Sequence, residues 1–214
     1  MMAAMRLYEY EDAYVQAQEL CGRIVEILKE DIAQRGRALL LVPGGSSPKK
    51  LFEALKASNL SWDKITLSLT DERCVPCESA DCNAKMIERA LGVKPVQLWD
   101  DVKGVMCEKD AQSHIWPASA IILGMGPDGH FASLFPHQVM QGETMLIEGV
   151  APQEPQKRVS YTLPQLLGTK NLFLLVNGLE KRAVYERALQ GDESLPITHL
   201  IRAAGDKLNI YICD

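Results

Sequence analysis

The sequence predicts an α/β protein with a Rossmann-like, mostly parallel sheet that carries helices on both faces. Short apolar runs, typical of buried strands, alternate with segments whose apolar residues recur every three or four positions, as in amphipathic helices. Turns rich in glycine and proline separate many of these segments. The 214 residues contain no internal repeat and no linker-like stretch, so we expect a single domain over residues 1–214.

The first half of the chain begins with a long amphipathic helix. Its apolar residues recur from Ala13 to Ile32, about six turns, and Gly36 suits its end. Ser47 is expected to cap the next helix, with Pro48 at its first position. The later elements of this half are a strand at 38–42, a helix at 49–57, a strand at 65–69, a loop that holds 71–73, and a helix at 83–91.

The second half repeats the alternation less regularly. Residues 94–113 are interpreted as one short strand and one short helix, and residues 151–156, with two prolines, as a surface loop. Asn177 is expected to cap a helix, with Glu180 completing a capping box. The remaining predicted elements are a strand at 120–123, extended segments at 145–150 and 159–162, a strand at 171–176, helices at 179–189 and 196–201, and a strand at 208–213.

Composition limits the class of partner. Hydrophobic residues make up 47% and charged residues 24%, the usual balance of a globular protein. The net charge of −5 argues against a nucleic-acid partner, although local cations can still attract a small anionic substrate. No apolar run approaches the ~18 residues of a membrane span. Because residues 1–10 also lack the apolar core of a signal peptide, we expect a cytoplasmic protein without a membrane partner.

The six cysteines are expected to be free thiols, because disulfides are rare in proteins without a secretion signal. Cys74, Cys77 and Cys82 look like half of a zinc site. A second pair of Cys or His ligands is missing at a suitable spacing, so we predict no metal.

Two helix starts carry cations in unusual places. The turn Gly44-Gly45-Ser46-Ser47 leads into a helix whose first turn holds Lys49 and Lys50, and the amino-terminal end of a helix disfavours positive charge. A phosphate bound by the backbone N–H groups of the turn would relieve this. The alternative is a capping turn with two solvated lysines. Lys181 repeats the pattern, although Glu180 could simply pair with it.

Charged side chains also follow the strand at 65–69. Asp71, Glu72 and Arg73 come directly after it and so lie at the carboxyl edge of the predicted sheet, where open α/β sheets bind ligands. The carboxylates could orient a general base or bind hydroxyl groups, and Arg73 could hold a carboxylate or a phosphate. The alternative is a surface loop held by ion pairs.

The segment 124–130, GMGPDGH, follows an apolar strand and places His130 at the same edge of the sheet. Histidine transfers protons readily near neutral pH, and Asp128 can hold one tautomer of its ring. Because no G-x-S-x-G motif is present, a base that activates water is favoured over a covalent acyl-enzyme. His114, His137 and His199 lack such a setting and are interpreted as structural or surface residues.

The same segment matches the letters of the dinucleotide motif G-x-G-x-x-G. A dinucleotide site also needs an unbroken helix after the motif. Pro127 lies inside the motif and Pro136 ends any helix soon after it, so we expect no nucleotide cofactor.

The motifs together resemble a known family. In chain order they are GGSSP at 44–48, DERCVP at 71–76 with Asn83 following, LGMGPDGHFASLFP at 123–136, RVSYTLP at 158–164, and Gly178-x-x-Lys181. On these residues the chain resembles the 6-phosphogluconolactonases, within the wider group that includes glucosamine-6-phosphate deaminase. The resemblance runs from about residue 5 to the C-terminus.

The resemblance implies a Rossmann-like sheet, no metal, no organic cofactor, and hydrolysis of 6-phosphoglucono-1,5-lactone in the oxidative pentose phosphate pathway. It places His130 on the catalytic histidine of the family, with Asp128 beside it. Asp71, Glu72 and Arg73 fall on the cluster at the site. The residues expected to bind the substrate or its phosphate are Gly44, Gly45, Ser46, Ser47, Asn83, Arg158 and Lys181.

Two other functions remain open on the sequence. Deaminases of the group usually carry phenylalanine-asparagine-glutamate-proline after the histidine, where this chain has residues 133–136, SLFP, without the carboxylate. A non-catalytic sugar-phosphate sensor would normally add a DNA-binding helix-turn-helix, for which no residues remain. We expect a sugar phosphate as the partner, and a monomer or a small homo-oligomer.

Overall fold

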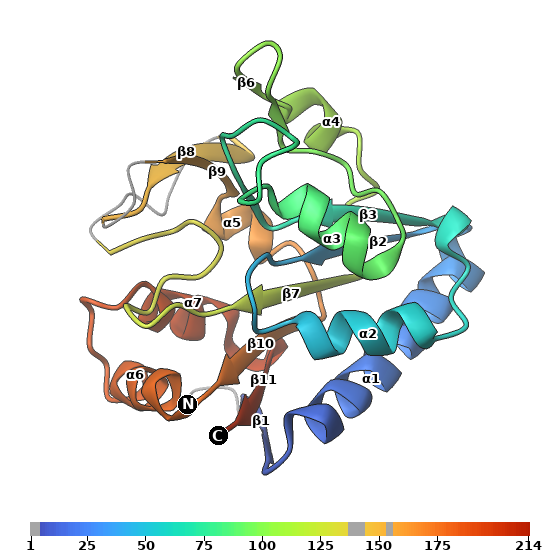
Figure 1. The fold of residues 1–214 in the computed structure, drawn as a ribbon. Coiled ribbons are helices and arrows are strands. Elements are labelled where there is room, and N and C mark those ends of the chain that lie inside the picture. The colour runs from blue at the N-terminus through green and yellow to red at the C-terminus, as the bar shows by residue number, and fades with distance from the viewer. Residues whose placement is uncertain (1–4, 137–143, 153–155) are drawn as a thin grey trace.

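The computed structural model describes residues 5–136, 144–152 and 156–214 and is built around a six-stranded parallel sheet (Figure 1). The strand order is β1-β11-β10-β7-β2-β3, and every neighbouring pair runs parallel. The strands are β1 (Arg6–Tyr10), β2 (Ala38–Val42), β3 (Ile65–Leu69), β7 (Ala120–Gly124), β10 (Leu172–Asn177) and β11 (Leu208–Cys213). The predicted α/β class is confirmed.

Helices cover both faces of this sheet, as predicted (Figure 1). α1 (Ala13–Arg35) and α2 (Lys49–Ala57) lie on one face, and α6 (Leu179–Leu189) and α7 (Pro196–Ala204) lie on the other. The connections from β1 to β2 and β3 cross the sheet in one direction, whereas the connection from β10 to β11 crosses it in the opposite direction. Right-handed crossovers then put their helices on opposite faces. The other helices are α3 (Asn83–Leu91), α4 (Glu108–Gln112) and α5 (Leu163–Leu166), with 3₁₀ turns η1 (Trp62–Lys64) and η2 (Gly205–Lys207).

The long helix α1 has the boundaries that its sequence predicts. The Asp12 carboxylate accepts hydrogen bonds from the backbone N–H groups of Tyr14 and Val15, at 2.6 and 3.1 Å, and so caps the first turn. Gly36 ends the helix in the left-handed conformation, with φ of 79°, and its N–H bonds to the Ile32 carbonyl. The apolar face between these ends is buried against the sheet.

The capping residues of α2 and α6 differ from the prediction, although both helices begin where predicted. Their N-cap residues are Pro48 and Gly178, neither of which has a side chain that can cap, so the predicted caps Ser47 and Asn177 are wrong. The Ser47 hydroxyl instead accepts a hydrogen bond from Lys181, and the Asn177 side chain accepts one from a glutamine of α1. Both helices therefore begin without side-chain caps, at the carboxyl edge of the sheet.

A second, antiparallel sheet holds residues that the sequence placed in a loop. Residues 71–73 form β4 (Asp71–Arg73), which pairs with β9 (Lys157–Tyr161), and β9 pairs with β8 (Leu146–Val150). The loop prediction is therefore wrong. Its cause is that the partner strand comes from a distant part of the chain, so no local pattern reveals the pairing.

Three smaller elements were not predicted: the second of two short strands in residues 94–113, strand β1 and helix α5; the short helix expected in 94–113 is present as α4. Residues 94–113 contain two short strands, β5 (Trp99–Asp100) and β6 (Val105–Met106), which pair with each other, followed by α4. Strand β1 lies at the sheet edge with four of its five residues exposed, so it lacks an alternating apolar pattern. Helix α5 has only four residues. The predicted surface loop at 151–156 lies partly outside the described residues.

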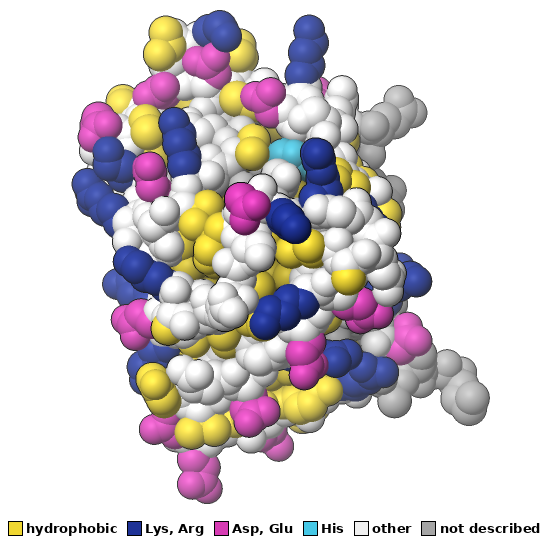
Figure 2. Space-filling view, turned by 90° about the vertical axis from the view of Figure 1, so that its right-hand side faces the viewer, with side chains coloured by type: hydrophobic (Ala, Val, Ile, Leu, Met, Phe, Trp, Pro, Cys, Tyr) yellow, Lys and Arg dark blue, Asp and Glu magenta, His cyan; other side chains and the backbone are white. Residues whose placement is uncertain are grey.

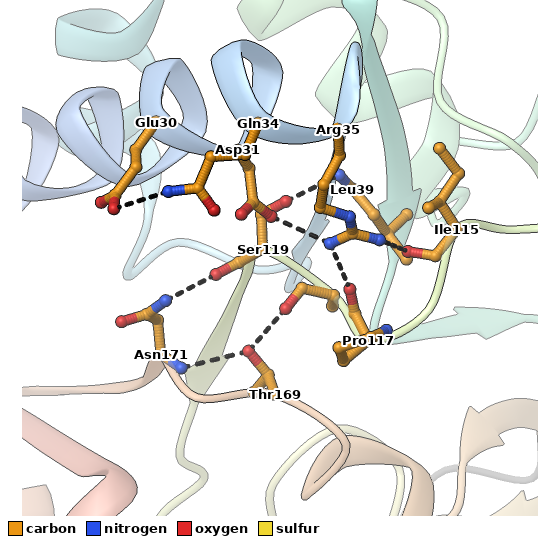
Figure 3. A network of polar contacts seen from close by, with 11 residues as sticks. Glu30, Asp31, Gln34, Arg35, Leu39, Ile115, Pro117, Ser119, Thr169 and Asn171 are labelled. Atoms are coloured by element: carbon orange, nitrogen blue, oxygen red, sulfur yellow. Dashed lines mark hydrogen bonds and ion pairs between the residues drawn. The ribbon is translucent and has the colours of Figure 1, made fainter.

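The opposite, amino-terminal edge of the sheet is held by side-chain bonds between three segments (Figure 3). Arg35, in the last turn of α1, donates to the carbonyls of Ile115 and Pro117 at 2.9 and 3.0 Å. Asn171, just before β10, donates to the Ser119 carbonyl at 2.9 Å. These bonds tie the end of α1 to the segments that lead into β7 and β10.

Replacing Arg35 with alanine should lower the free energy of unfolding by about 1–2 kcal/mol, because the partly buried Ile115 carbonyl and the exposed Pro117 carbonyl both lose a charged donor. Urea unfolding followed by circular dichroism would show a lower midpoint with an unchanged slope. Lys29→Ala, at an exposed position of the same helix, is the control and should change the midpoint little. Equal midpoints for the two variants would contradict this role of Arg35.

Charges of both signs are interspersed over the face of the molecule shown in Figure 2. Lysine and arginine side chains alternate there with aspartate and glutamate, and hydrophobic side chains lie between them. Neither sign therefore dominates this face. Within the described ranges, no helix is both long and apolar enough to cross a membrane.

Candidate active site

A cavity of about 190 Å³ opens at the carboxyl edge of the parallel sheet, where the segments after β2, β3 and β7 meet the start of α6. The described residues that line it include ten of the twelve predicted site residues: Gly44, Gly45, Ser46, Ser47, Asp71, Arg73, Asn83, His130, Arg158 and Lys181. Asp128 and Glu72 are not among the lining residues. The convergence follows from the parallel sheet, because all its strands end at one edge.

His130 and Asp128 form a hydrogen-bonded pair in the loop after β7. The imidazole Nδ1 lies 2.5 Å from Asp128 Oδ1, which also accepts the backbone N–H of His130 at 3.2 Å. The loop turns sharply at Gly129, whose φ is 78°, and the Gly126 N–H closes it on the His130 carbonyl at 2.9 Å. The tight turn brings the Asp128 carboxylate against the ring of His130, which lies two residues further along the chain.

The Asp128 carboxyl stays ionised near neutral pH. Burial alone would raise its pKa, but the hydrogen bond and charge of His130, with backbone N–H donors, together outweigh burial and lower the pKa. An ionised carboxylate can only accept a hydrogen bond, so Asp128 keeps the proton of the neutral ring on Nδ1 and leaves the Nε2 lone pair available. The His130 side chain is 27% exposed and lines the cavity, so water in the cavity can contact the ring.

Two guanidinium groups line another part of the cavity. Arg73 and Arg158 are directly paired residues of β4 and β9. Like charges at such positions repel, so the pair is most stable with an anion between or beside its members. The buried Nε of Arg73 has no hydrogen-bond partner among the described residues.

Lys181 brings a third cation and connects the two uncapped helix starts. Its Nζ donates to the Ser47 hydroxyl at 3.1 Å, across the gap between α6 and α2. Burial lowers the pKa of Lys181, and the Glu180 charge opposes that change. An anion held here would gain the charge of Lys181 and the unpaired N–H groups of the helix starts.

Anion affinity beside Lys181 should fall at a lower pH than it would beside a lysine with an ordinary pKa. The lowered pKa means that Lys181 is fully charged only at lower pH and loses its charge as pH rises through that value. Sulfate is a suitable probe because its own charge is constant over the range. Calorimetric titration between about pH 7 and pH 10 should show weakening affinity in the native protein. In Lys181→Arg, which stays charged, a similar weakening would contradict this explanation.

Asp71 and its neighbours form a buried polar group in the cavity wall. The Asp71 carboxylate accepts hydrogen bonds from the hydroxyls of Ser133, at 2.7 Å, and Thr70, at 3.2 Å. Its backbone carbonyl accepts from the Asn83 side chain at 3.0 Å. Ser133 is not among the predicted site residues. A small polar residue inside an apolar run was the available signal that it had a buried partner.

Glu72 faces away from the cavity. Its carboxylate accepts the backbone N–H groups of Arg73, Asn83 and Ala84 at 2.7, 2.8 and 2.7 Å. Burial raises the pKa of Glu72, although these three donors oppose it. The Glu72 carboxylate therefore does not line the cavity, and the geometry does not support the catalytic role expected for it. Its position instead holds the start of α3, and with it Asn83, against β4.

Gly44 is required where the turn passes Asn83. A Cβ atom on Gly44 would collide with the Asn83 side-chain amide. Gly126 is in the same situation beside His130 and Asp128. The glycines of both motifs thus make room for side chains that line the cavity.

The remaining histidines have other surroundings. His114 is half-buried with Nε2 3.2 Å from the Ser68 hydroxyl, and His199 is close to a backbone carbonyl at the surface. His137 lies outside the described residues. Within the described part of the chain, no three His, Cys, Asp or Glu side chains are grouped so that they could hold a metal ion.

The fold and the site together define an α/β protein whose cleft at the strand ends is lined by three cationic residues and holds a histidine–aspartate pair. The family model "Glucosamine-6-phosphate isomerases/6-phosphogluconolactonase" matches residues 11–209. The chain belongs to this family, and the resemblance drawn from its motifs is confirmed.

Individual relatives support this assignment. A 6-phosphogluconolactonase of Mesorhizobium japonicum is 32% identical, over 91% of this chain and 90% of its own. The solved structure of a 6-phosphogluconolactonase from Shewanella baltica has a TM-score of 0.86 at 22% identity, covering 100% of both chains. A monomeric glucosamine-6-phosphate deaminase has a TM-score of 0.78 at 18% identity, covering 98% of this chain and 97% of its own. The two structural matches show the fold alone, which the lactonase and the deaminase share.

Proposed function

We propose that the chain hydrolyses 6-phospho-D-glucono-1,5-lactone to 6-phospho-D-gluconate, with His130 as the general base that activates water. The observation that supports this most is one cavity lined by both the imidazole of the His130–Asp128 pair and the cations Arg73, Arg158 and Lys181. A sugar-phosphate lactone has matching parts, an electrophilic ester carbon and a doubly charged phosphate. The names of the relatives agree with this substrate.

In the proposed mechanism, His130 Nε2 takes a proton from water while the water oxygen bonds to lactone C1. The carbonyl oxygen becomes an oxyanion, which N–H donors of the cavity wall stabilise. The tetrahedral intermediate then breaks its bond from C1 to the ring oxygen. The imidazolium returns its proton to that oxygen, and the product is an open-chain acid. Asp128 holds the ring through both transfers.

Binding of the phosphate group, which is remote from the reacting carbon, supplies the energy that positions lactone C1. We assign the phosphate to the turn at Gly45 and Ser46, with Arg158 and Lys181 as its cations. A lactone carbonyl is already electrophilic, so one base suffices and no metal or organic cofactor is required. We place the reaction in the oxidative pentose phosphate pathway and the protein in the cytoplasm.

A pH-stat assay with freshly generated 6-phosphogluconolactone tests the proposal. We expect acid release far above the spontaneous rate, measured in parallel without protein. Ammonia release from glucosamine 6-phosphate, without acceleration of lactone opening, would identify a deaminase instead. Tight binding of 6-phosphogluconate without turnover of either compound would identify a sensor. Each of these two outcomes contradicts the proposal.

A further inference from the structure

Phe135 is a buried aromatic residue with unusual neighbours. Its side chain is only 2% exposed, yet it lies outside the contiguous hydrophobic core of the described residues, which includes Phe131 and Leu134 of the same loop. Nor does it line the cavity. A buried ring that neither joins the core nor reaches the cavity needs another reason for its position.

Two side chains that line the cavity contact the Phe135 ring. The imidazole of His130 lies 4.6 Å from it, centroid to centroid, with the rings tilted by 45°. The guanidinium carbon of Arg158 lies 5.5 Å from the Phe135 centroid, over its face. The phenyl ring is therefore in contact with both the base and a cation of the anion-binding end.

The His130–Asp128 hydrogen bond leaves one rotation of the imidazole unrestrained. It fixes the distance of Nδ1 from the carboxylate, but the imidazole can still rock about that bond and change the direction of Nε2. A phenyl ring packed against the imidazole removes this freedom. Since Asp128 and Phe135 contact His130 in different ways, the ring is held by a hydrogen bond and by packing.

We propose that Phe135 is a positioning residue, which holds the His130 imidazole in its productive direction and links that direction to the position of Arg158. This inference rests on the proposed function. The anion-binding end and the base then form one unit of three side chains in contact, so substrate phosphate on Arg158 favours the direction of Nε2 that attack requires. A misdirected base lowers the rate of the chemical step more than it lowers substrate affinity.

Phe135→Leu tests the proposal because it keeps most of the apolar volume and removes the ring. We expect kcat for the lactone to fall about tenfold, while KM changes less than about threefold. Phe173→Leu is the matched control, since Phe173 is equally buried but belongs to the core in β10. The control should lose comparable stability and keep its kcat. Equal loss of kcat in both variants would show that Phe135 has a structural role alone and would overturn the positioning role.

A double-mutant cycle tests the link to Arg158. In an Arg158→Gln background, Phe135→Leu should cost only about twofold in kcat, because the linked unit is already broken. Strictly additive effects on kcat would overturn the link.

A spectroscopic measurement separates this inference from the proposed function, because it requires no turnover. The ¹⁵N signals of the His130 ring in ligand-free protein should indicate one ordered tautomer in the native chain, and broadened or mixed signals in Phe135→Leu. Unchanged ring signals would overturn the positioning role, even if the native protein is an active lactonase. If the native protein lacks lactonase activity but the signals change as expected, the proposed function fails and the positioning role stands.

Discussion

Replacing His130 with alanine is expected to lower the turnover of 6-phosphogluconolactone by at least about a hundredfold, up to about ten-thousandfold. In the proposed mechanism, the variant loses the base that removes the proton from water and the acid that protonates the leaving ring oxygen. Its KM should change little, because the phosphate contacts proposed for Arg158 and Lys181 remain. Stopped-flow or pH-stat kinetics, corrected for spontaneous opening, measures this effect.

The fold should survive this substitution, since the His130 side chain is partly exposed in the cavity wall. Thermal unfolding of the variant within a few degrees of the native midpoint would establish that. His199→Ala, which removes the same side chain at the surface, serves as the control and should retain native turnover. Near-native turnover in His130→Ala would remove His130 from the mechanism.

Replacing Gly126 with alanine should lower kcat by about ten- to a hundredfold, although the added group is a single methyl. A Cβ atom at this position would overlap the His130 ring at Cε1 and Nδ1 and lie 2.9 Å from Asp128 Oδ1. The ring and the carboxylate must therefore move, and their hydrogen bond cannot keep its geometry. Because φ at Gly126 is not positive, the backbone itself tolerates alanine, so stability should fall less than activity.

Gly124→Ala separates displacement of the pair from crowding of the cavity. Gly124 also lines the cavity, but a Cβ there meets no atom of the described structure within 4 Å. This variant should raise KM if the methyl contacts substrate, and it should keep the native pH dependence of kcat. Gly126→Ala should lower kcat and alter that pH dependence. The same kinetic signature in both variants would contradict displacement of the His130–Asp128 pair.

The main layers of the fold could be predicted because they depend on local patterns. Helices α2, α3 and α6 and strands β2 and β3 have the predicted boundaries. Periodic apolar residues indicate which face of each segment is buried, and flanking glycines and prolines indicate where it ends. Both signals lie within a few residues of the segment. The predictions failed where a distant partner decides the conformation, as in β4, or where burial is slight, as in β1.

The site could be predicted in outline for a related reason. In a parallel sheet, any residue that directly follows a strand lies at the carboxyl edge, so the motifs around Gly44, Asp71 and His130 had to converge. The orientation of individual side chains could not be predicted. Glu72 and Asp71 are adjacent in sequence, yet one carboxylate binds backbone N–H groups of α3 and the other lines the cavity.

The sequence by itself determined the α/β class, the family and the edge of the sheet where the motifs meet. Each of these depends on short-range pattern, which every segment carries whatever surrounds it. Only the tertiary structure decided that Arg73 pairs with Arg158, that Ser133 binds Asp71, and that Phe135 lies against both His130 and Arg158. The physical reason is that hydrogen bonds and ring contacts form between side chains brought together by strand pairing and loop packing, and their partners are not adjacent in the chain.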